Sequence, residues 1–179
     1  MRCHPGHQLG LVFAANTAAV VVAQLPVLTV LRGHRRTSAL ALAFAAMGCA
    51  WAIVLAAGGA ASPTAVVSAL GLAMVVLAIG ETAISPSAPA LANDLAPDAL
   101  RGRYNGVYTL AWTTGFAAGP ALAGAVLAAG HAHALMVGLI AACAVGAVGS
   151  LRLAQDLPAG VDIVEADHAG APVPEPARS

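Results

Sequence analysis

Five long apolar runs, separated by short polar turns, dominate the chain. They occupy residues 9–31, 39–57, 64–95, 107–128 and 134–154. A helix rises about 1.5 Å per residue, so each run is long enough to cross a hydrocarbon core of about 30 Å. Inside a bilayer the main chain must satisfy its own hydrogen bonds, which favours helices. The pattern predicts an all-α fold, a polytopic membrane helix bundle with five transmembrane helices.

Composition favours the same class of protein. Hydrophobic residues make up 59% of the chain and charged residues only 9%, and the mean hydropathy is +0.82. A soluble domain carries about 25% charged residues, and a chain of this size cannot bury so much apolar surface in one core. The formal net charge is +0, with no basic face for nucleic acid. The expected surroundings are therefore a lipid bilayer, with no nucleic-acid partner.

The runs divide the chain into three parts. Residues 1–8 form a short polar N-terminal segment, and residues 9–154 form the five-helix membrane domain. Residues 155–179 are acidic and rich in proline near the end, a composition typical of disorder. We expect this last part to be a disordered cytoplasmic tail.

Positive charge gathers on alternate turns. The first loop, the third loop and the end of the fifth run contain arginine, whereas the second and fourth loops contain none. Cytoplasmic loops of membrane proteins carry the excess of positive charge, so the N-terminus is predicted outside and the C-terminus in the cytoplasm. The loop residues singled out are Arg32, Gly33, Arg35 and Arg36 in the first loop and Asp94, Arg101 and Gly102 around the third.

Residues 79–124 resemble the region from helix ten to helix eleven of the major facilitator superfamily (MFS) of secondary transporters. In that family a helix ending in Pro and Asp leads into a Pro-acid-Arg-Gly turn, matched here by residues 97–103. The first loop, residues 32–36, resembles a degenerate copy of a second loop motif of the family. It lacks the aspartate of that motif. A glycine-proline motif of family antiporters is matched by a small-residue stretch that also permits close helix packing: Gly115, Gly119, Pro120 and Gly124.

The resemblance covers roughly residues 9–154 and implies the C-terminal half of such a transporter, helices eight to twelve. It implies a plasma-membrane, proton-coupled effluxer of small, largely apolar, drug-like molecules, with the substrate path between two helical halves. The expected partners are a small-molecule substrate and either a separate N-terminal half or a second copy in a homodimer. The alternative is a non-transporting membrane protein, either a remnant or a helix-packing subunit.

Glu81 is the only acidic residue in the interior of the third apolar run, since Asp94 lies at the end of that run. A charged carboxylate inside a bilayer costs at least about 2.5 kcal/mol on insertion scales. Its side chain must therefore face a cavity, a partner or a source of protons. Two roles stay open at this point, coupling to a proton or substrate and hydrogen bonding to a neighbouring helix.

Four further side chains are candidates for lining a cavity. Asn16 and Gln24 lie in the first run, where such groups turn toward partner helices. Tyr108 and Trp112, with Tyr104, recur every four residues and share one helix face. These rings either line a cavity for an aromatic or cationic substrate or form an aromatic belt at the membrane boundary.

Catalytic chemistry has little support in the sequence. The chain contains no Ser/His/Asp grouping, no paired intramembrane carboxylates and no phosphate-binding loop. Cys3, His4 and His7 cluster near the N-terminus without a fourth ligand and without the spacing of a known site. We expect no catalytic residue, no metal site and no cofactor, and hence a protein that is not an enzyme.

Overall fold

The computed structural model describes residues 17–18, 21–22, 24, 26–27, 29–30 and 33–157. Every element in them is helical, and four helices are long and apolar enough to cross a membrane. The predicted all-α membrane bundle is thereby confirmed. The first of the five predicted spans, residues 9–31, lies largely outside the described residues. The elements are α2 (Arg36–Ala57), α3 (Pro63–Asp94), η1 (Asp98–Leu100), α4 (Arg101–Ala128) and α5 (Ala132–Asp156).

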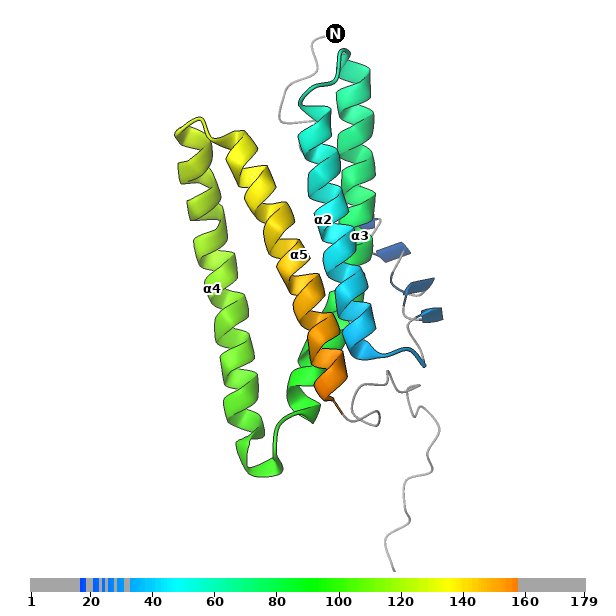
Figure 1. Ribbon diagram of the computed structural model, residues 1–179, viewed down its shortest axis with the longest axis vertical. Coiled ribbons are helices and arrows are strands. Elements are labelled where there is room, and N and C mark those ends of the chain that lie inside the picture. The colour runs from blue at the N-terminus through cyan, green and yellow to red at the C-terminus, as the bar shows by residue number, and fades with distance from the viewer. Residues whose placement is uncertain are drawn as a thin grey trace, which may run out of the picture.

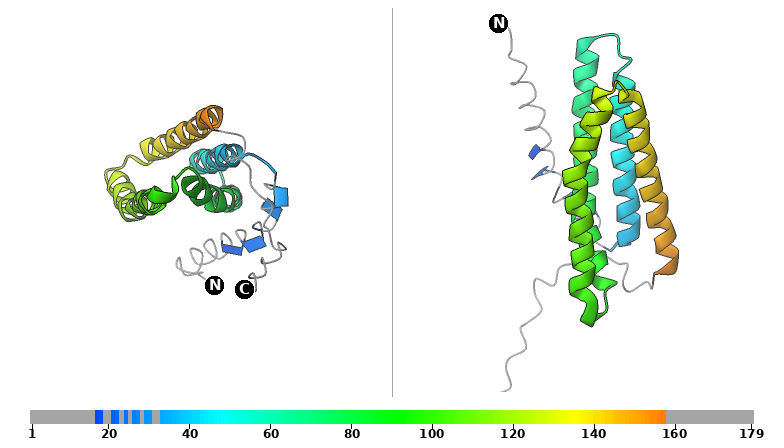
Figure 2. Two further views of the ribbon diagram at one scale, coloured as in Figure 1. Left: turned by 90° about the horizontal axis from the view of Figure 1, so that it is seen from below. Right: turned by 90° about the vertical axis from the view of Figure 1, so that its left-hand side faces the viewer.

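Helix α2 is the centre of the bundle. It packs against α3 on one side and α5 on the other, whereas α4 contacts α3 and α5 only sparsely. Figure 1 and Figure 2 show α4 standing apart, joined to α5 at one end and to α3 at the other. No residue of α4 is buried within the described part of the chain, and Ser150 is the single buried residue of α5.

Small residues let α2 approach both neighbours closely. Ala39 and Ala43 of α2 form a buried cluster with Ala83 of α3. A Cβ atom at Gly80 would lie 2.8 Å from Cγ of Met47 and 3.0 Å from the carbonyl oxygen of Ala43, so only glycine permits this contact. Tight backbone approach of this kind replaces the hydrophobic effect as a source of helix association in lipid.

The contact between α2 and α5 follows the same principle. A Cβ atom at Gly146 would lie 2.8 Å from the ring of Phe44. The aromatic ring therefore fills the space that the missing side chain leaves. Helix α2 therefore packs closely against a glycine on each side, Gly80 of α3 and Gly146 of α5.

The two uncharged turns are set by local sequence. Ser62 caps α3 by accepting a hydrogen bond from the Ala65 amide at 3.2 Å, and Pro63 takes the first helical position. Helix α4 ends in a Schellman motif, in which Gly130 has a φ of 77° and the His131 amide donates to the Val126 carbonyl. Both turns reverse the chain without charge.

The charged turn between α3 and α4 is shorter than predicted. Helix α4 begins at Arg101, six residues before the predicted start at residue 107, so Arg101 and Gly102 belong to its first turn. The amide of Leu100 donates to the Pro97 carbonyl at 2.7 Å and closes the short helix η1. The Asn105 amide also donates to the side-chain oxygen of Asn93 at 3.3 Å, which holds the start of α4 beside the end of α3.

Other predicted loop residues also lie at helix ends. Arg36 is the first residue of α2 and Asp94 the last of α3, while Gly33 and Arg35 precede α2 as expected. Helix α5 continues to Asp156, two residues beyond the predicted boundary at residue 154. The loops are shorter than predicted because polar residues assigned to them, such as Arg36 and Asp94, lie in the helix ends and pair with each other there.

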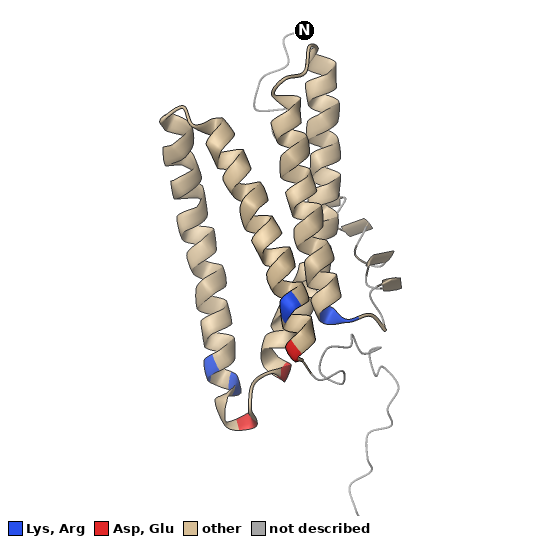
Figure 3. Cartoon of the chain, viewed as in Figure 1, with Lys and Arg blue, Asp and Glu red and all other residues tan. Residues whose placement is uncertain are grey.

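Apart from Glu81, the charged residues of the described helices gather at one end of the bundle (Figure 3). Figure 3 shows the arginine and aspartate residues of the described chain at the end where α2 and α4 begin. Arg36 forms an ion pair with Asp94, and the Arg35 guanidinium donates to the carbonyl oxygen of Ala154 near the end of α5. Because α2 is antiparallel to α3 and α5, both arginines lie beside helix C-termini, whose partial negative charge they offset.

Replacing Gly80 with leucine should separate α2 from α3. The new side chain would overlap Met47 and the Ala43 carbonyl, so we expect the free energy of unfolding to fall by about 1–3 kcal/mol. The measurement is thermal unfolding of the purified chain in detergent. Gly71→Leu is the matched control, since no atom lies within 4 Å of a Cβ built there. Equal melting temperatures for the two variants would contradict this account of the packing.

Replacing Asp94 with asparagine should weaken the charged end. Arg36 is only 12% exposed and would lose its carboxylate, so we expect a loss of roughly 1–3 kcal/mol in unfolding free energy. Asp98→Asn is the control, because Asp98 is 91% exposed and pairs with Arg101 across 3.0 Å at the surface. That variant should lose less than about 1 kcal/mol. A loss of the same size in both variants would show that the Arg36–Asp94 pair does not join the helices.

Candidate functional site

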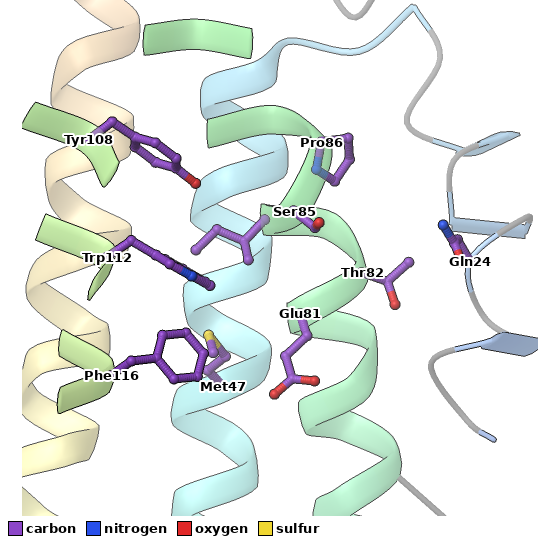
Figure 4. Close-up of a pocket in the computed structure, with 10 residues that line it drawn as sticks. Gln24, Met47, Glu81, Thr82, Ser85, Pro86, Tyr108, Trp112 and Phe116 are labelled. Carbon is purple, nitrogen blue, oxygen red and sulfur yellow. The ribbon is translucent and has the colours of Figure 1, made fainter. Parts of the chain in front are cut away.

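A pocket opens between α3 and α4, with part of α2 in its wall. Its volume is about 730 Å³, within the range of small-molecule sites. Figure 4 shows three aromatic rings projecting from α4 toward α2 and α3, and Glu81 projecting from α3 toward them. The lining residues are Gln24, Met47, Glu81, Thr82, Ile84, Ser85, Pro86, Tyr108, Trp112 and Phe116.

The packing of the preceding residue, Gly80, sets the direction of the Glu81 side chain. Gly80 is pressed against α2, and successive residues of an α-helix are turned by about 100°. The Glu81 side chain therefore leaves the α2 contact and enters the pocket wall, where it is half-buried. The ion pairs that the structure describes join Arg36 to Asp94 and Arg101 to Asp98, and no arginine lines the pocket. Within the described residues the carboxylate has no cationic partner.

The wall on α4 is a ladder of aromatic rings. The centroids of Tyr108 and Trp112 are 6.5 Å apart with an interplanar angle of 20°, and those of Trp112 and Phe116 are 5.2 Å apart at 58°. The rings stand four residues apart and so share one face of the helix. Eight residues of helix extend this ladder over roughly 12 Å.

The wall on α3 offers hydrogen-bond acceptors. Pro86 has no amide hydrogen, so the Thr82 carbonyl lacks its helical donor, and Pro89 does the same for the Ser85 carbonyl. The Thr82 hydroxyl is already used, donating to the Ala78 carbonyl at 2.7 Å. Helix α3 nevertheless continues through both prolines to Asp94. Thr82 and Ser85, whose carbonyl oxygens lack helical donors, therefore line the pocket together with Glu81.

Several predicted site residues come together in this pocket. Glu81, Gln24, Tyr108 and Trp112 all line it, although Gln24 lies on the far side of α3 from the rings (Figure 4). Asn16 and Arg32 lie outside the described residues. The prediction missed Phe116, which continues the four-residue spacing of the aromatic ladder and could have been found from it.

The glycine-proline stretch of α4 is placed differently from the other predicted sites. Gly115, Gly119, Pro120 and Gly124 are exposed, and a Cβ atom at any of the three glycines would meet no atom within 4 Å. Within the described chain no helix packs against this stretch. Its role in packing stays a prediction, and the glycines that do pack are Gly80 and Gly146.

Comparison with known proteins identifies the family. The family model described as Major Facilitator Superfamily matches residues 4–176, which is nearly the whole chain. Searches of curated proteins and of solved structures returned no match. Members of the family are transporters rather than enzymes, and the four long apolar helices fit a multi-pass membrane protein. The chain belongs to the Major Facilitator Superfamily and is a membrane transporter of that type.

Proposed function

We propose that the chain forms the C-terminal part, helices eight to twelve, of a proton-coupled exporter of small, largely apolar compounds in the plasma membrane. The observation that carries this proposal is Glu81. It is an acidic residue in the middle of a membrane-spanning helix, it lines a pocket of about 730 Å³, and no described cation pairs with it. Intramembrane ionisable residues of this kind mark substrate paths and proton relays.

The electrostatics of the site support proton coupling. A charged carboxylate is costly within a bilayer, and binding a proton removes that charge. A cavity that opens alternately to the two sides of the membrane lets Glu81 take up a proton on one side and release it on the other. The free energy of the proton gradient is then available to drive the substrate through the same pocket.

The charge distribution supports one orientation. The described arginines lie at the end where α2 and α4 begin, and the turns at the opposite end carry no arginine. By the positive-inside rule the arginine-rich end faces the cytoplasm. With a first span over residues 9–31, we propose that the N-terminus lies outside and the C-terminus, including the predicted tail, in the cytoplasm.

The substrate path needs a second wall. Alternating access works by rocking two sets of helices about a central site, and the aromatic ladder of α4 has none of its residues buried in the described chain. Complementary helices facing α4 would close the pocket. We propose that they come from an N-terminal half, on the same or a separate polypeptide, and a second copy in a homodimer is the other arrangement.

One observation favours a different function. Helices α4 and α5 bury almost no residues within the described chain, which also suits a subunit whose only role is to pack against other membrane helices. The two functions differ in flux. A helix-packing subunit moves no solute in any assembly, whereas a transporter half does so once its complement is present.

Glu81→Gln tests the transport proposal directly. The chain is reconstituted in liposomes with a seven-helix N-terminal piece of a matching transporter, and efflux of the neutral lipophilic dye Nile red is followed under an imposed pH gradient. We expect the assembly to move the dye and the variant to lose at least about tenfold in rate, because an amide keeps the shape but cannot release a proton. Asp98→Asn, on an exposed turn outside the pocket, should transport normally.

Three results would contradict parts of this proposal. Unchanged pH-driven efflux in Glu81→Gln would assign the carboxylate a packing role. Saturable efflux by the chain alone would show that no complementary half is required. An assembly that folds but moves no dye and no other small compound would favour the helix-packing subunit.

A further inference from the structure

We propose that the acidic tail after α5 binds the arginines at the charged end of the bundle and thereby ties the start of α4 to the end of α5. The acidic tail is the part of the predicted tail from residue 158 to residue 179, which lies outside the described residues. Its binding surface consists of Arg101 and Arg103 on α4 and Arg152 on α5. This contact is independent of what the pocket binds.

The surface has arginine side chains that the described chain leaves available. Arg103 and Arg152 are exposed and form no hydrogen bond or ion pair with any described residue. Arg101 is 54% exposed and pairs with Asp98, which is itself 91% exposed. An exposed ion pair contributes little to stability, so Arg101 can exchange this partner for another carboxylate. Three guanidinium groups are therefore open to an anionic ligand.

The two parts of the chain are complementary in charge. Among the described residues, the charged end holds five arginines and three aspartates, a formal net charge of +2: Arg35, Arg36, Arg101, Arg103 and Arg152, with Asp94, Asp98 and Asp156. The acidic tail contains four acidic side chains and one arginine, a formal side-chain charge of −3: Asp162, Glu165, Asp167 and Glu175, with Arg178. Opposite charge therefore favours the tail as the ligand of this end.

The acidic tail also starts at the correct end of the bundle. Helices α4 and α5 are antiparallel and joined by one short turn, so the start of α4 and the end of α5 share an end (Figure 1). Asp162, Glu165 and Asp167 follow the last residue of α5, Asp156, by 6 to 11 positions. An extended chain of that length reaches roughly 20–40 Å. This reach exceeds the distance of about 8–10 Å between the axes of packed helices, which allows for the divergence of α4 from α5.

Tethering favours the acidic tail over a free anion. A short flexible linker gives its ligand an effective concentration in the millimolar range, and residues 162–167 bring three carboxylates that can meet several arginines at once. An anionic phospholipid, the competing ligand, offers one phosphate charge per molecule. Binding of this kind does not require a folded tail, so it agrees with the disorder predicted for that segment.

Helix α4 is the element on which such a tie acts. It contacts α3 and α5 only sparsely, and a hydrogen bond of 3.3 Å between the side chains of Asn105 and Asn93 holds its start beside α3. A bound tail adds a second connection, from the end of α5 to the start of α4. It thereby restrains the helix that carries the aromatic wall of the pocket.

One introduced amine can detect the contact, because the chain contains no lysine. The full chain with Arg103→Lys, which keeps the positive charge, is placed in nanodiscs of zwitterionic lipid and treated with a carbodiimide. This reagent joins an amine to a carboxylate that touches it, and mass spectrometry of the monomeric product identifies the carboxylate. We expect products with Asp162, Glu165 or Asp167. Their yield should fall at least about threefold between about 0.05 M and 0.5 M salt, because salt screens exposed charges.

Ser38→Lys is the matched control. Ser38 is the third residue of α2 and Arg103 the third residue of α4, and both are exposed at the charged end. The start of α2 lies beside the end of α5, since the Arg35 guanidinium donates to the Ala154 carbonyl. A tail that collides at random would therefore join Ser38→Lys at least as often as Arg103→Lys. A tail held on α4 should join Arg103→Lys at least about fivefold more often, because binding raises its local concentration there.

Neutralising the tail tests the consequence for α4. In the triple variant Asp162→Asn, Glu165→Gln and Asp167→Asn, amide hydrogen exchange in the first turns of α4 should be at least about threefold faster, because local opening is easier. Exchange in α2, which packs against α3 and α5, should stay the same. Size-exclusion chromatography and circular dichroism show whether each variant is folded.

Equal yields from Arg103→Lys and Ser38→Lys would overturn the proposal. Loss of the tail product when phosphatidylglycerol is added to the nanodiscs would assign the arginines to lipid headgroups instead. Products that join only two different chains would assign the tail to a second copy. Unchanged exchange in α4 of the folded triple variant would show that the tail does not tie the two helices.

Discussion

The close contact of α3 with α2 at Gly80 is the constraint on which the site depends. A side chain at this position would overlap Met47 and the backbone of Ala43. The close contact therefore requires the rotational setting of α3 that turns Gly80 toward α2. That setting buries Ala83, Ser87 and Leu91 of α3. It also turns Glu81 away from the contact and into the pocket, because the next residue of a helix lies about 100° around the axis. A glycine with no chemistry of its own thereby directs the one intramembrane carboxylate.

In the rest of the bundle, the apolar packing contacts and the charged contacts lie in different regions. Small residues join α2 to its two neighbours in the apolar middle, while Arg35 and Arg36 join the same helices at the charged end. Helix α4 takes little part in either set of contacts. It is tied to α3 chiefly through the short turn and the Asn105–Asn93 hydrogen bond, which leaves its aromatic face open to a ligand or to further helices.

Much of this arrangement could be predicted from the sequence because it depends on local signals. Apolar run length located the described spanning helices, the Ser62–Pro63 pair marked the start of α3, and an isolated acidic residue in an apolar run marked Glu81. Spacing of four residues placed Tyr108 and Trp112 on one face. These features need no knowledge of which helix lies beside which.

The contacts between helices could not be predicted in this way. Helix α2 is apolar all around, so no periodic stripe showed that it would be central or that Gly80 and Gly146 would face it. The Arg36–Asp94 pair joins residues 58 positions apart and depends on the antiparallel pairing of α2 and α3. Conversely, the most visible glycine pattern, in α4, meets no described helix.

Water access along α3 is the measurement that tests the central claim most directly, because the claim is that α3 turns one face toward a hydrated pocket. Cys3, Cys49 and Cys143 are replaced, and single cysteines are placed at Ser85 in the pocket wall and at Leu72 outside it. Each position lies nine residues from one end of α3, so the two have similar depth. Thiols react with maleimides as thiolates, which form only where water reaches. In the reconstituted assembly Ser85→Cys should react rapidly with a hydrophilic maleimide and Leu72→Cys slowly. Equal, slow labelling at both positions would show that the pocket is closed to water and that Glu81 cannot serve as its proton carrier.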